Sequence, residues 1–169
     1  LRKKLHLYQK NMEQHLWKDE GEVLSIRDSV TLVVGLGDIG SQFAEKMHAL
    51  GSEVIGVRKH KAARPDYIKE VCQQEDLDRL LPKADIVACC MPGTGETAGM
   101  FDLERMKKMK PGAILINVGR GSLIPGEALK KMLVEGHLGG AILDVTEEEP
   151  LPADSPLWDL PNLLYTPLV

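Results

Sequence analysis

Six short, uninterrupted apolar runs, separated by polar or helical spacers, constrain what this chain can fold into. The runs do not alternate between apolar and polar residues, so both faces of each predicted strand should be buried. Buried strands with helices between them are typical of a parallel sheet covered on both sides. The six predicted strands span residues 31–34, 53–57, 86–90, 113–116, 141–143 and 163–165.

The spacers support this interpretation because four of them have the pattern of helices. These predicted helices span residues 39–50, 76–81, 102–109 and 126–135. Asp102 is a plausible N-cap for the third, and Pro111 and Gly112 follow its end.

The two ends of the chain differ from this pattern. A further helix is predicted within residues 1–18, where four apolar side chains recur at helical spacing: Leu5, Tyr8, Met12 and Leu16. A polar stretch follows, in which a short strand is considered at residues 23–25. The proline-rich final part, from residue 147, is expected to run over the surface, apart from its one strand.

Length and charge exclude several classes of protein. A chain of 169 residues is expected to form one domain. Its net charge of −4 argues against non-specific binding to nucleic acid or to an anionic membrane. Neither a transmembrane run nor a secretory leader is recognised. The three cysteines are odd in number and lack metal-ligand spacing, so we expect inert thiols, no metal site and a cytoplasmic location.

A glycine pattern follows the first predicted strand. Gly35, Gly37 and Gly40 form G-x-G-x-x-G between an apolar strand and an amphipathic helix. In that context the first glycine permits a tight turn, the second lets a pyrophosphate approach the backbone, and the third lets helix and strand pack closely. The N–H groups of Asp38 and Ile39 would face the anion at the helix N-terminus. The alternatives are a glycine-rich turn without a ligand and a methyltransferase loop.

The next strand ends in a basic segment, residues 58–61. NAD-binding sites usually carry an acidic residue here, which binds the adenosine ribose, but this chain has Arg58, Lys59, His60 and Lys61. An arginine fork with a nearby lysine suits a 2′-phosphate. We therefore expect NADP as cofactor, with NAD as a further option. The alternative is a solvated basic loop.

Two later segments carry a resemblance to a known family. P-G-A-I-L-I-N-V-G-R-G-S-L-I (residues 111–124) and G-G-A-I-L-D-V-T-E-E-E-P-L-P (139–152) resemble the cofactor-binding domain of the D-isomer-specific 2-hydroxyacid dehydrogenases. Together with the glycine pattern, M-P-G-T-G-E-T (91–97) and the closing L-W-D-L-P-N-L-L-Y-T-P, the resemblance covers almost the whole chain. It implies a doubly wound Rossmann α/β fold, with a mostly parallel sheet and helices on both faces.

The resemblance also implies roles for individual residues. Arg120 matches the catalytic arginine that grips the substrate carboxylate, and Glu149 matches the glutamate that holds a catalytic histidine. Asp144 matches the acceptor for the nicotinamide carboxamide. The remaining candidate cofactor contacts are Pro92, Thr97 and Val118. Alternatively, Arg120 is a salt-bridge residue; Glu147 and Glu148 are expected to be solvated.

Three departures from the family pattern affect these expectations. The catalytic histidine of the family follows the last T-P, where this chain has Leu168, which cannot donate a proton. Residues 1–169 match the dinucleotide-binding domain only, so the substrate-binding domain is expected to be absent from this chain. Pro125 replaces the usual Asp or Asn, which we expect to be a local change only.

The resulting function hypothesis is hydride transfer between a nicotinamide cofactor and a small 2-oxo or D-2-hydroxy acid of the glyoxylate or hydroxypyruvate type. Its alternative is a catalytically silent NADP(H)-binding or interaction module without a general acid. The apolar stripe of the first helix, with Trp17 near its end, favours a homodimer, because this region lies at the subunit interface in relatives.

Overall fold

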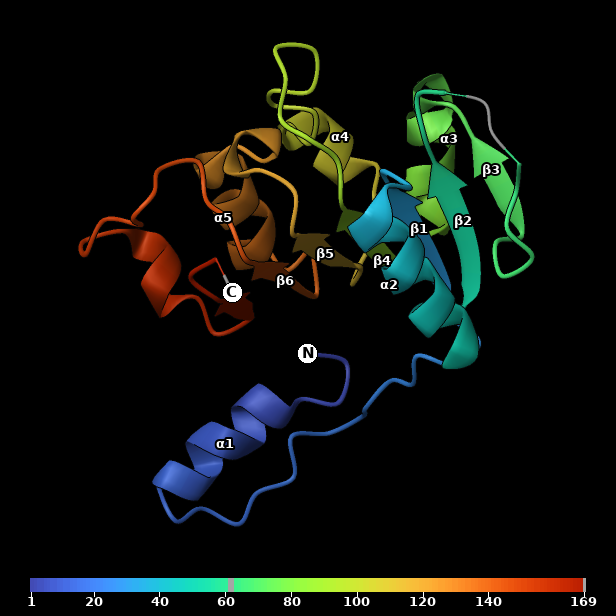
Figure 1. The fold of residues 1–169 in the computed structure, drawn as a ribbon. Coiled ribbons are helices and arrows are strands. Elements are labelled where there is room, and N and C mark those ends of the chain that lie inside the picture. The colour runs from blue at the N-terminus through green and yellow to red at the C-terminus, as the bar shows by residue number, and fades with distance from the viewer. Residues whose placement is uncertain (61–62, 169) are drawn as a thin grey trace.

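The computed structural model describes residues 1–60 and 63–168, and its strands form one sheet (Figure 1). Every pair of neighbouring strands is parallel, and the strand order is β3-β2-β1-β4-β5-β6-β7. The strands are β1 (Val30–Val34), β2 (Glu53–Val57), β3 (Glu70–Cys72), β4 (Ile86–Cys89), β5 (Ile114–Asn117), β6 (Gly140–Leu143) and β7 (Leu163–Tyr165). The six predicted strands are confirmed, with ends that shift by one residue at most.

Helices cover the sheet on both faces, as predicted. Helix α2 (Asp38–Ala49) packs through Ala44 and Met47 against Val33 of β1. The neighbours of Val33 on the strand, Leu32 and Val34, belong to a separate and larger core. That second core contains side chains of α3 (Leu77–Leu80), α4 (Leu103–Lys107) and α5 (Gly126–Val134). The fold is therefore the doubly wound Rossmann arrangement of an α/β protein.

Local capping explains where the shorter helical segments begin. Asp102 is the N-cap of α4, as predicted, and its carboxylate accepts a hydrogen bond from the Arg105 N–H at 2.8 Å. The predicted helix at residues 76–81 is divided: α3 has four residues, with the 3-10 turn Gln74–Asp76 before it and the 3-10 turn Leu81–Lys83 after it. Two further 3-10 turns lie elsewhere in the chain, at Gly121–Leu123 and Pro156–Asp159.

The structure corrects two strand predictions. Strand β3 was not predicted, and it pairs with β2 at the edge of the sheet. The strand considered at residues 23–25 is wrong: Leu24 donates one backbone hydrogen bond to Arg2 at 2.9 Å, and no strand is assigned to these described residues. Val23 and Leu24 are 42% and 47% exposed, because no neighbouring strand buries them.

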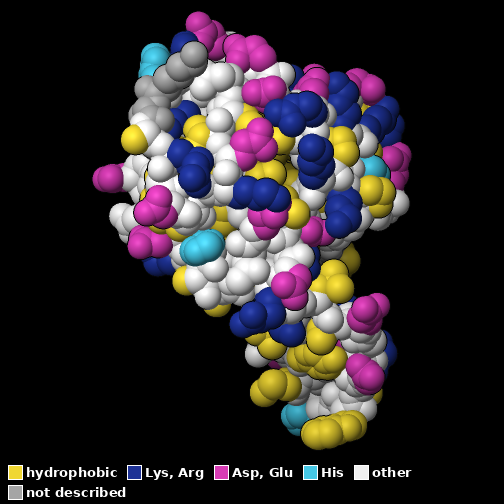
Figure 2. Space-filling model, turned by 90° about the vertical axis from the view of Figure 1, so that its right-hand side faces the viewer, with side chains coloured by type: hydrophobic (Ala, Val, Ile, Leu, Met, Phe, Trp, Pro, Cys, Tyr) yellow, Lys and Arg dark blue, Asp and Glu magenta, His cyan; other side chains and the backbone are white. Residues whose placement is uncertain are grey.

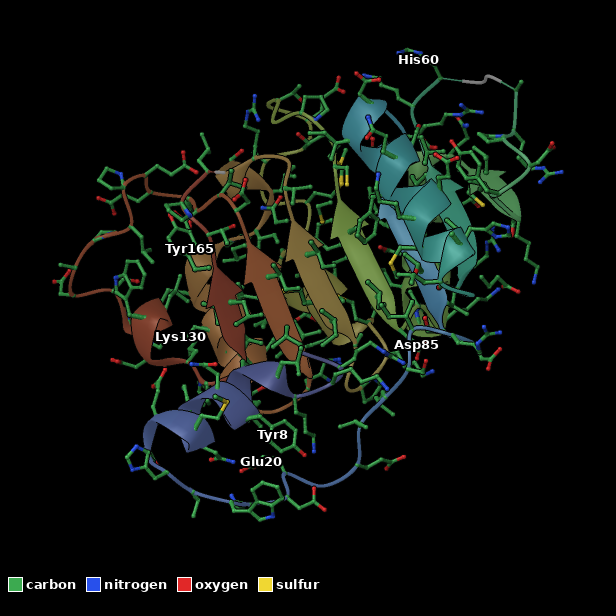
Figure 3. All side chains as sticks on the ribbon, turned by 60° about the horizontal axis from the view of Figure 1, so that its bottom comes forward. Tyr8, Glu20, His60, Asp85, Lys130 and Tyr165 are labelled. Atoms are coloured by element: carbon green, nitrogen blue, oxygen red, sulfur yellow. The ribbon has the colours of Figure 1, made fainter. Side chains whose placement is uncertain are left out.

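Helix α1 (Leu5–Glu13) is shorter than predicted and forms a lobe outside the sheet (Figures 1 and 2). The chain turns back after it through His15, whose φ is +52°. The returning segment is fixed to the helix: the Asn11 amide donates to Glu20 at 2.7 Å, and Figure 3 shows Tyr8 and Glu20 together beneath the sheet. None of the residues of α1 is buried. No helix of the described chain is long and apolar enough to cross a membrane.

Candidate cofactor-binding site

The strand order reverses its direction at β1, and the ligand crevice of an open α/β sheet is expected at such a point. Helix α2 connects β1 to β2 on one face, whereas α4 follows β4 on the other face. Loops that leave neighbouring strands toward opposite faces diverge at the carboxyl edge, and ligands of open α/β sheets bind there. The candidate residues all follow strand ends at this edge: Gly35 after β1, Arg58 after β2, Pro92 after β4, Val118 and Arg120 after β5, and Asp144 after β6.

Two of the three glycines have no room for a side chain. Gly35 has a φ of +102°, and a Cβ there would lie 2.8 Å from the carbonyl carbon of Cys90. At Gly40, a Cβ would lie 1.8 Å from the Gly35 oxygen. The turn and the close approach of α2 to β1 therefore require glycine at both positions.

Gly37 differs, because a Cβ built on it would meet nothing within 4 Å. The residue is exposed and caps α2, with Asp38 and Ile39 as the first residues of the helix. The first N–H groups of a helix have no partner within it, and the helix dipole favours an anion there. The space beside Gly37 is therefore open next to these groups, as the approach of an anion requires.

The basic segment lies beside the crevice. The backbone N–H of Arg58 donates to the Cys72 carbonyl at 3.2 Å. The guanidinium of Arg58 donates to the Ala63 carbonyl at 2.9 Å. Arg58 and Arg64 line one hollow of about 440 Å³ together with Glu70 and Asp76. Sequence reasoning missed Arg64, whose only signal is its charge in an irregular loop.

Other members of the basic segment lie further out. Lys59 is exposed and pairs with Glu96 at 2.8 Å. His60 is exposed at the periphery of the molecule, as Figure 3 shows. Lys61, the remaining basic residue, lies outside the described residues.

The loop after β4 is held by its own hydrogen bonds. The Thr97 hydroxyl accepts from the Thr94 N–H at 2.8 Å and donates to the Pro92 carbonyl at 3.1 Å. Thr97 is buried, whereas Pro92 is exposed. Thr97 therefore shapes the loop, and Pro92 is the candidate of this pair that faces outward.

Arg120 is exposed at the end of β5, and its backbone is fixed on both sides. The Asn117 side chain donates to the Arg120 carbonyl at 2.9 Å. A Cβ on Gly121 would lie 1.7 Å from the Thr146 oxygen, so the chain packs tightly against the loop after β6. In this structure the guanidinium donates to the Gly119 carbonyl at 2.7 Å. Val118, half-buried, donates its N–H to Cys89 at 3.1 Å.

Asp144 and the end of the chain are joined by hydrogen bonds. The Thr166 hydroxyl donates to Asp144 Oδ1 at 2.5 Å, and the Leu168 N–H donates to the Asp144 carbonyl at 3.1 Å. Leu168, at the position where the resemblance implies a histidine, is thus adjacent to Asp144. Glu149 is exposed and accepts from the Thr146 N–H at 3.0 Å.

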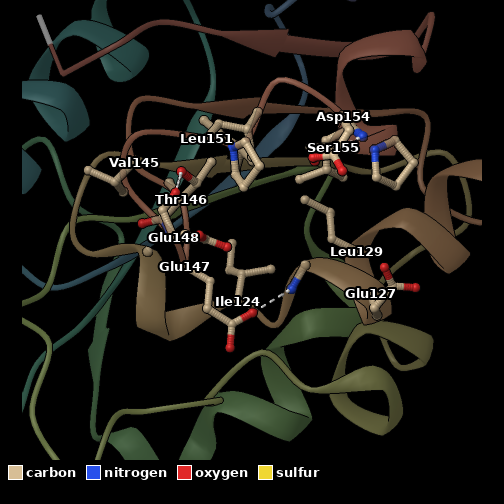
Figure 4. Close-up of a pocket in the computed structure, with 17 residues that line it drawn as sticks. Ile124, Glu127, Leu129, Val145, Thr146, Glu147, Glu148, Leu151, Asp154 and Ser155 are labelled. Carbon is tan, nitrogen blue, oxygen red and sulfur yellow. Dashed lines mark hydrogen bonds between the residues drawn. The ribbon is translucent and has the colours of Figure 1, made fainter.

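A separate pocket of about 340 Å³ is lined in part by residues 145–148, in the loop after β6 (Figure 4). Four acidic residues line it: Glu127, Glu147, Glu148 and Asp154. Glu147 is exposed but accepts from the Gly126 N–H at 3.1 Å, a helix-capping contact that sequence reasoning missed. The glycine loop and the basic segment contribute no lining residue, so this pocket is distinct from the crevice.

The cysteines beneath the crevice carry protonated thiols. Burial raises the pKa of Cys90 to about 11 and that of Cys89 well above its ordinary value. Both thiols are therefore poor nucleophiles at neutral pH. Among the described residues, no group of three His, Cys, Asp or Glu side chains could hold a metal ion.

The crevice and its glycine loop define the class of dinucleotide-binding domains. Residues 1–169 match the model of the D-isomer specific 2-hydroxyacid dehydrogenase, NAD binding domain. The chain is 42% identical over 138 residues to a glyoxylate/hydroxypyruvate reductase B of Pectobacterium carotovorum subsp. carotovorum, covering 80% of this chain and 42% of the relative. This chain belongs to the D-isomer specific 2-hydroxyacid dehydrogenase family, as the sequence resemblance indicated.

Solved structures agree with this assignment. A D-isomer specific 2-hydroxyacid dehydrogenase family protein from Aeromonas salmonicida matches with a TM-score of 0.90 and 40% identity, over 99% of this chain and 53% of that one. An NADPH-dependent glyoxylate/hydroxypyruvate reductase from Sinorhizobium meliloti, in complex with NADP and sulfate, matches with a TM-score of 0.89 and 30% identity, over 99% and 54%. The chain thus spans about half the length of the relatives it matches.

Proposed function

We propose that this chain is the cofactor-binding part of an oxidoreductase that transfers a hydride between a nicotinamide dinucleotide and a small 2-oxo or D-2-hydroxy acid. The observation that carries the proposal is the open space at Gly37, between two glycines that admit no side chain. A pyrophosphate would lie in this space, held by the first N–H groups of α2. The glyoxylate/hydroxypyruvate reductases among the relatives support a substrate of that type.

The chemistry of the remaining residues follows from their types and positions. The nicotinamide, when bound, supplies or accepts the hydride. Arg120, exposed at the carboxyl edge, would bind the substrate carboxylate through two parallel hydrogen bonds. Asp144 would accept a hydrogen bond from the carboxamide. Glu149 would favour the charged form of a histidine at position 168, where this chain has Leu168, since a carboxylate favours a neighbouring imidazolium.

We infer that NADP(H) is preferred over NAD(H). Arg58 and Arg64 line the same hollow at the end of β2, and Lys59 lies next to Arg58. Glu70 and Asp76 also line the hollow, but no acidic residue occupies the position directly after β2 that an NAD ribose would use. A charge-assisted hydrogen bond to a phosphate contributes roughly 1.5–3 kcal/mol.

Calorimetric titration tests both statements. The wild-type chain should bind NADP about ten- to a hundredfold more tightly than NAD. Arg58→Ala should remove most of that difference by weakening NADP binding while leaving NAD binding nearly unchanged. Tighter binding of NAD than of NADP by the wild type would contradict the preference, and absence of binding of either dinucleotide would contradict the function.

We further infer a homodimer formed through α1, in a cytoplasmic protein. Leu5 and Met12 are 71% and 69% exposed, and Trp17 is fully exposed beyond the helix. Figure 2 shows apolar side chains on the surface of the lobe that contains α1. Sedimentation should give a dimer mass that Met12→Glu with Trp17→Glu reduces to the monomer mass.

The free cysteines are consistent with a reducing compartment.

A further inference from the structure

The ion pair of Lys59 and Glu96 joins the two loops that flank the glycine loop. Lys59 follows β2 and Glu96 lies in the loop after β4, with Nζ and Oε2 2.8 Å apart. Strand β1 lies between β2 and β4 in the sheet. The ion pair therefore bridges the crevice at the side where the adenosine half of a dinucleotide would lie.

The electrostatics of this pair oppose the binding of a phosphate. The Lys59 and Glu96 side chains are 65% and 74% exposed, and neither makes a second ion pair within the described part of the chain. The hydrogen bond between them raises the pKa of Lys59 and lowers that of Glu96, so both groups are charged at neutral pH. A 2′-phosphate must compete with this carboxylate for the ammonium, and the like charge of Glu96 disfavours its approach.

We propose that Glu96 is a specificity-determining residue that weakens the preference for NADP by holding Lys59; this rests on the proposed function of the crevice. The 2′-hydroxyl of NAD is neutral, so Glu96 affects its binding far less. Glu96 thus sets the ratio of the two affinities without contacting the reacting atoms.

The test compares two charge-neutralising variants of the same type. Glu96→Gln should tighten NADP binding about two- to fivefold, the range expected for an exposed ion pair, and leave NAD binding unchanged. Glu53→Gln is the matched control: Glu53 pairs with Lys69 at 2.6 Å, at the opposite end of β2, and the change of net charge is identical. The control should leave both dissociation constants at their wild-type values.

A second variant separates the action through Lys59 from a general charge effect. Lys59→Met should weaken NADP binding, and Glu96→Gln added to it should give a smaller gain than in the wild-type background. The gain from Glu96→Gln should also shrink at high ionic strength, because exposed charges are screened. Dissociation constants come from calorimetry of the purified chain with NADP and NAD.

The outcomes distinguish this proposal from the function on which it rests. Wild-type binding of both dinucleotides, with the same affinity ratio in Glu96→Gln, would overturn the role of Glu96 alone. An equal gain from Glu53→Gln would overturn it as well, because the effect would then be one of net charge. A wild-type chain that binds neither dinucleotide would overturn both proposals.

Discussion

Gly37 is the residue on which the cofactor site depends most directly. Gly37→Val would place a branched side chain in the open space where a pyrophosphate should lie. The variant should fold, because no atom lies within 4 Å of its Cβ, but its affinity for either dinucleotide should fall at least about tenfold. Calorimetry measures this loss, and circular dichroism checks the fold.

Gly126→Ala is a suitable control for this substitution. Gly126 also begins a helix, and its Cβ would make only ordinary contacts, at 3.9 Å with Glu147 and 4.0 Å with Leu157. Wild-type affinity in this variant, with loss in Gly37→Val, assigns the effect to the glycine loop. Unchanged affinity in Gly37→Val would mean that the phosphates bind elsewhere.

Single residues differ in how far the sequence can predict them. Gly35 and Gly40 were predicted in detail, because each meets a separate steric demand of one local turn, whereas the role of Gly37 stays a prediction. Thr97 shows the opposite: its type and motif suggest a cofactor contact, yet its hydroxyl is used within its own loop. Such a choice depends on the three-dimensional course of the loop, which spacing does not encode.

At the scale of elements, Asp78 joins α3 to the end of α4 through partly exposed ion pairs. Its carboxylate accepts from Arg105 at 2.7 Å and from Lys108 at 2.6 Å, and these two cations hold its pKa below the ordinary value. An Asp whose pKa is lowered on folding stabilises the protein above its unfolded pKa, near 3.9, and loses this contribution as the pH falls through the folded value.

Asp78→Asn should therefore lower the free energy of unfolding by about 1 kcal/mol at pH 7, the upper range for partly exposed pairs. The difference in unfolding free energy between wild type and variant should vanish as the pH falls below the pKa of Asp78 in the folded protein. Urea unfolding at several pH values measures it. A difference that is absent at pH 7, or that persists undiminished at pH 2, would contradict this role.

The strands show which elements a sequence pattern can predict and which it cannot. Uninterrupted apolar runs predicted the central strands, because burial on both faces leaves a strong signal. Strand β3 was missed because it has three residues, begins with an exposed glutamate and is defined by its pairing with β2. The strand considered at residues 23–25 was wrong for the converse reason: Val23 and Leu24 are apolar, but no partner strand buries them.

At the scale of the whole molecule, the polypeptide of 169 residues should reduce 2-oxo acids very poorly by itself. Leu168 stands where the family resemblance implies a general acid, a group typically worth ~10²–10⁴-fold in rate. The chain also spans about half the length of its relatives, and we expect the surfaces that orient substrate and exclude water to require the rest of that length. Oxidation of NADPH with glyoxylate or hydroxypyruvate measures the rate.

Two variants separate these deficits. Leu168→His alone should recover little, because the second deficit persists, whereas the same variant joined to the substrate-binding domain of a relative should recover more. Rapid NADPH oxidation by the unmodified chain would show that another group supplies the proton. None of the comparisons supports the alternative of a catalytically silent module.

The most direct test of the account is a titration of the ¹⁵N-labelled chain with NADP, followed by amide NMR shifts. An 18.6 kDa protein is suitable for this measurement. We predict saturable shifts at Gly37, Asp38 and Ile39, where the pyrophosphate should meet the N-terminus of α2, and at Arg58, beside the 2′-phosphate. Saturable shifts confined to the acidic pocket around Glu147, or no saturable shift at all, would contradict the account.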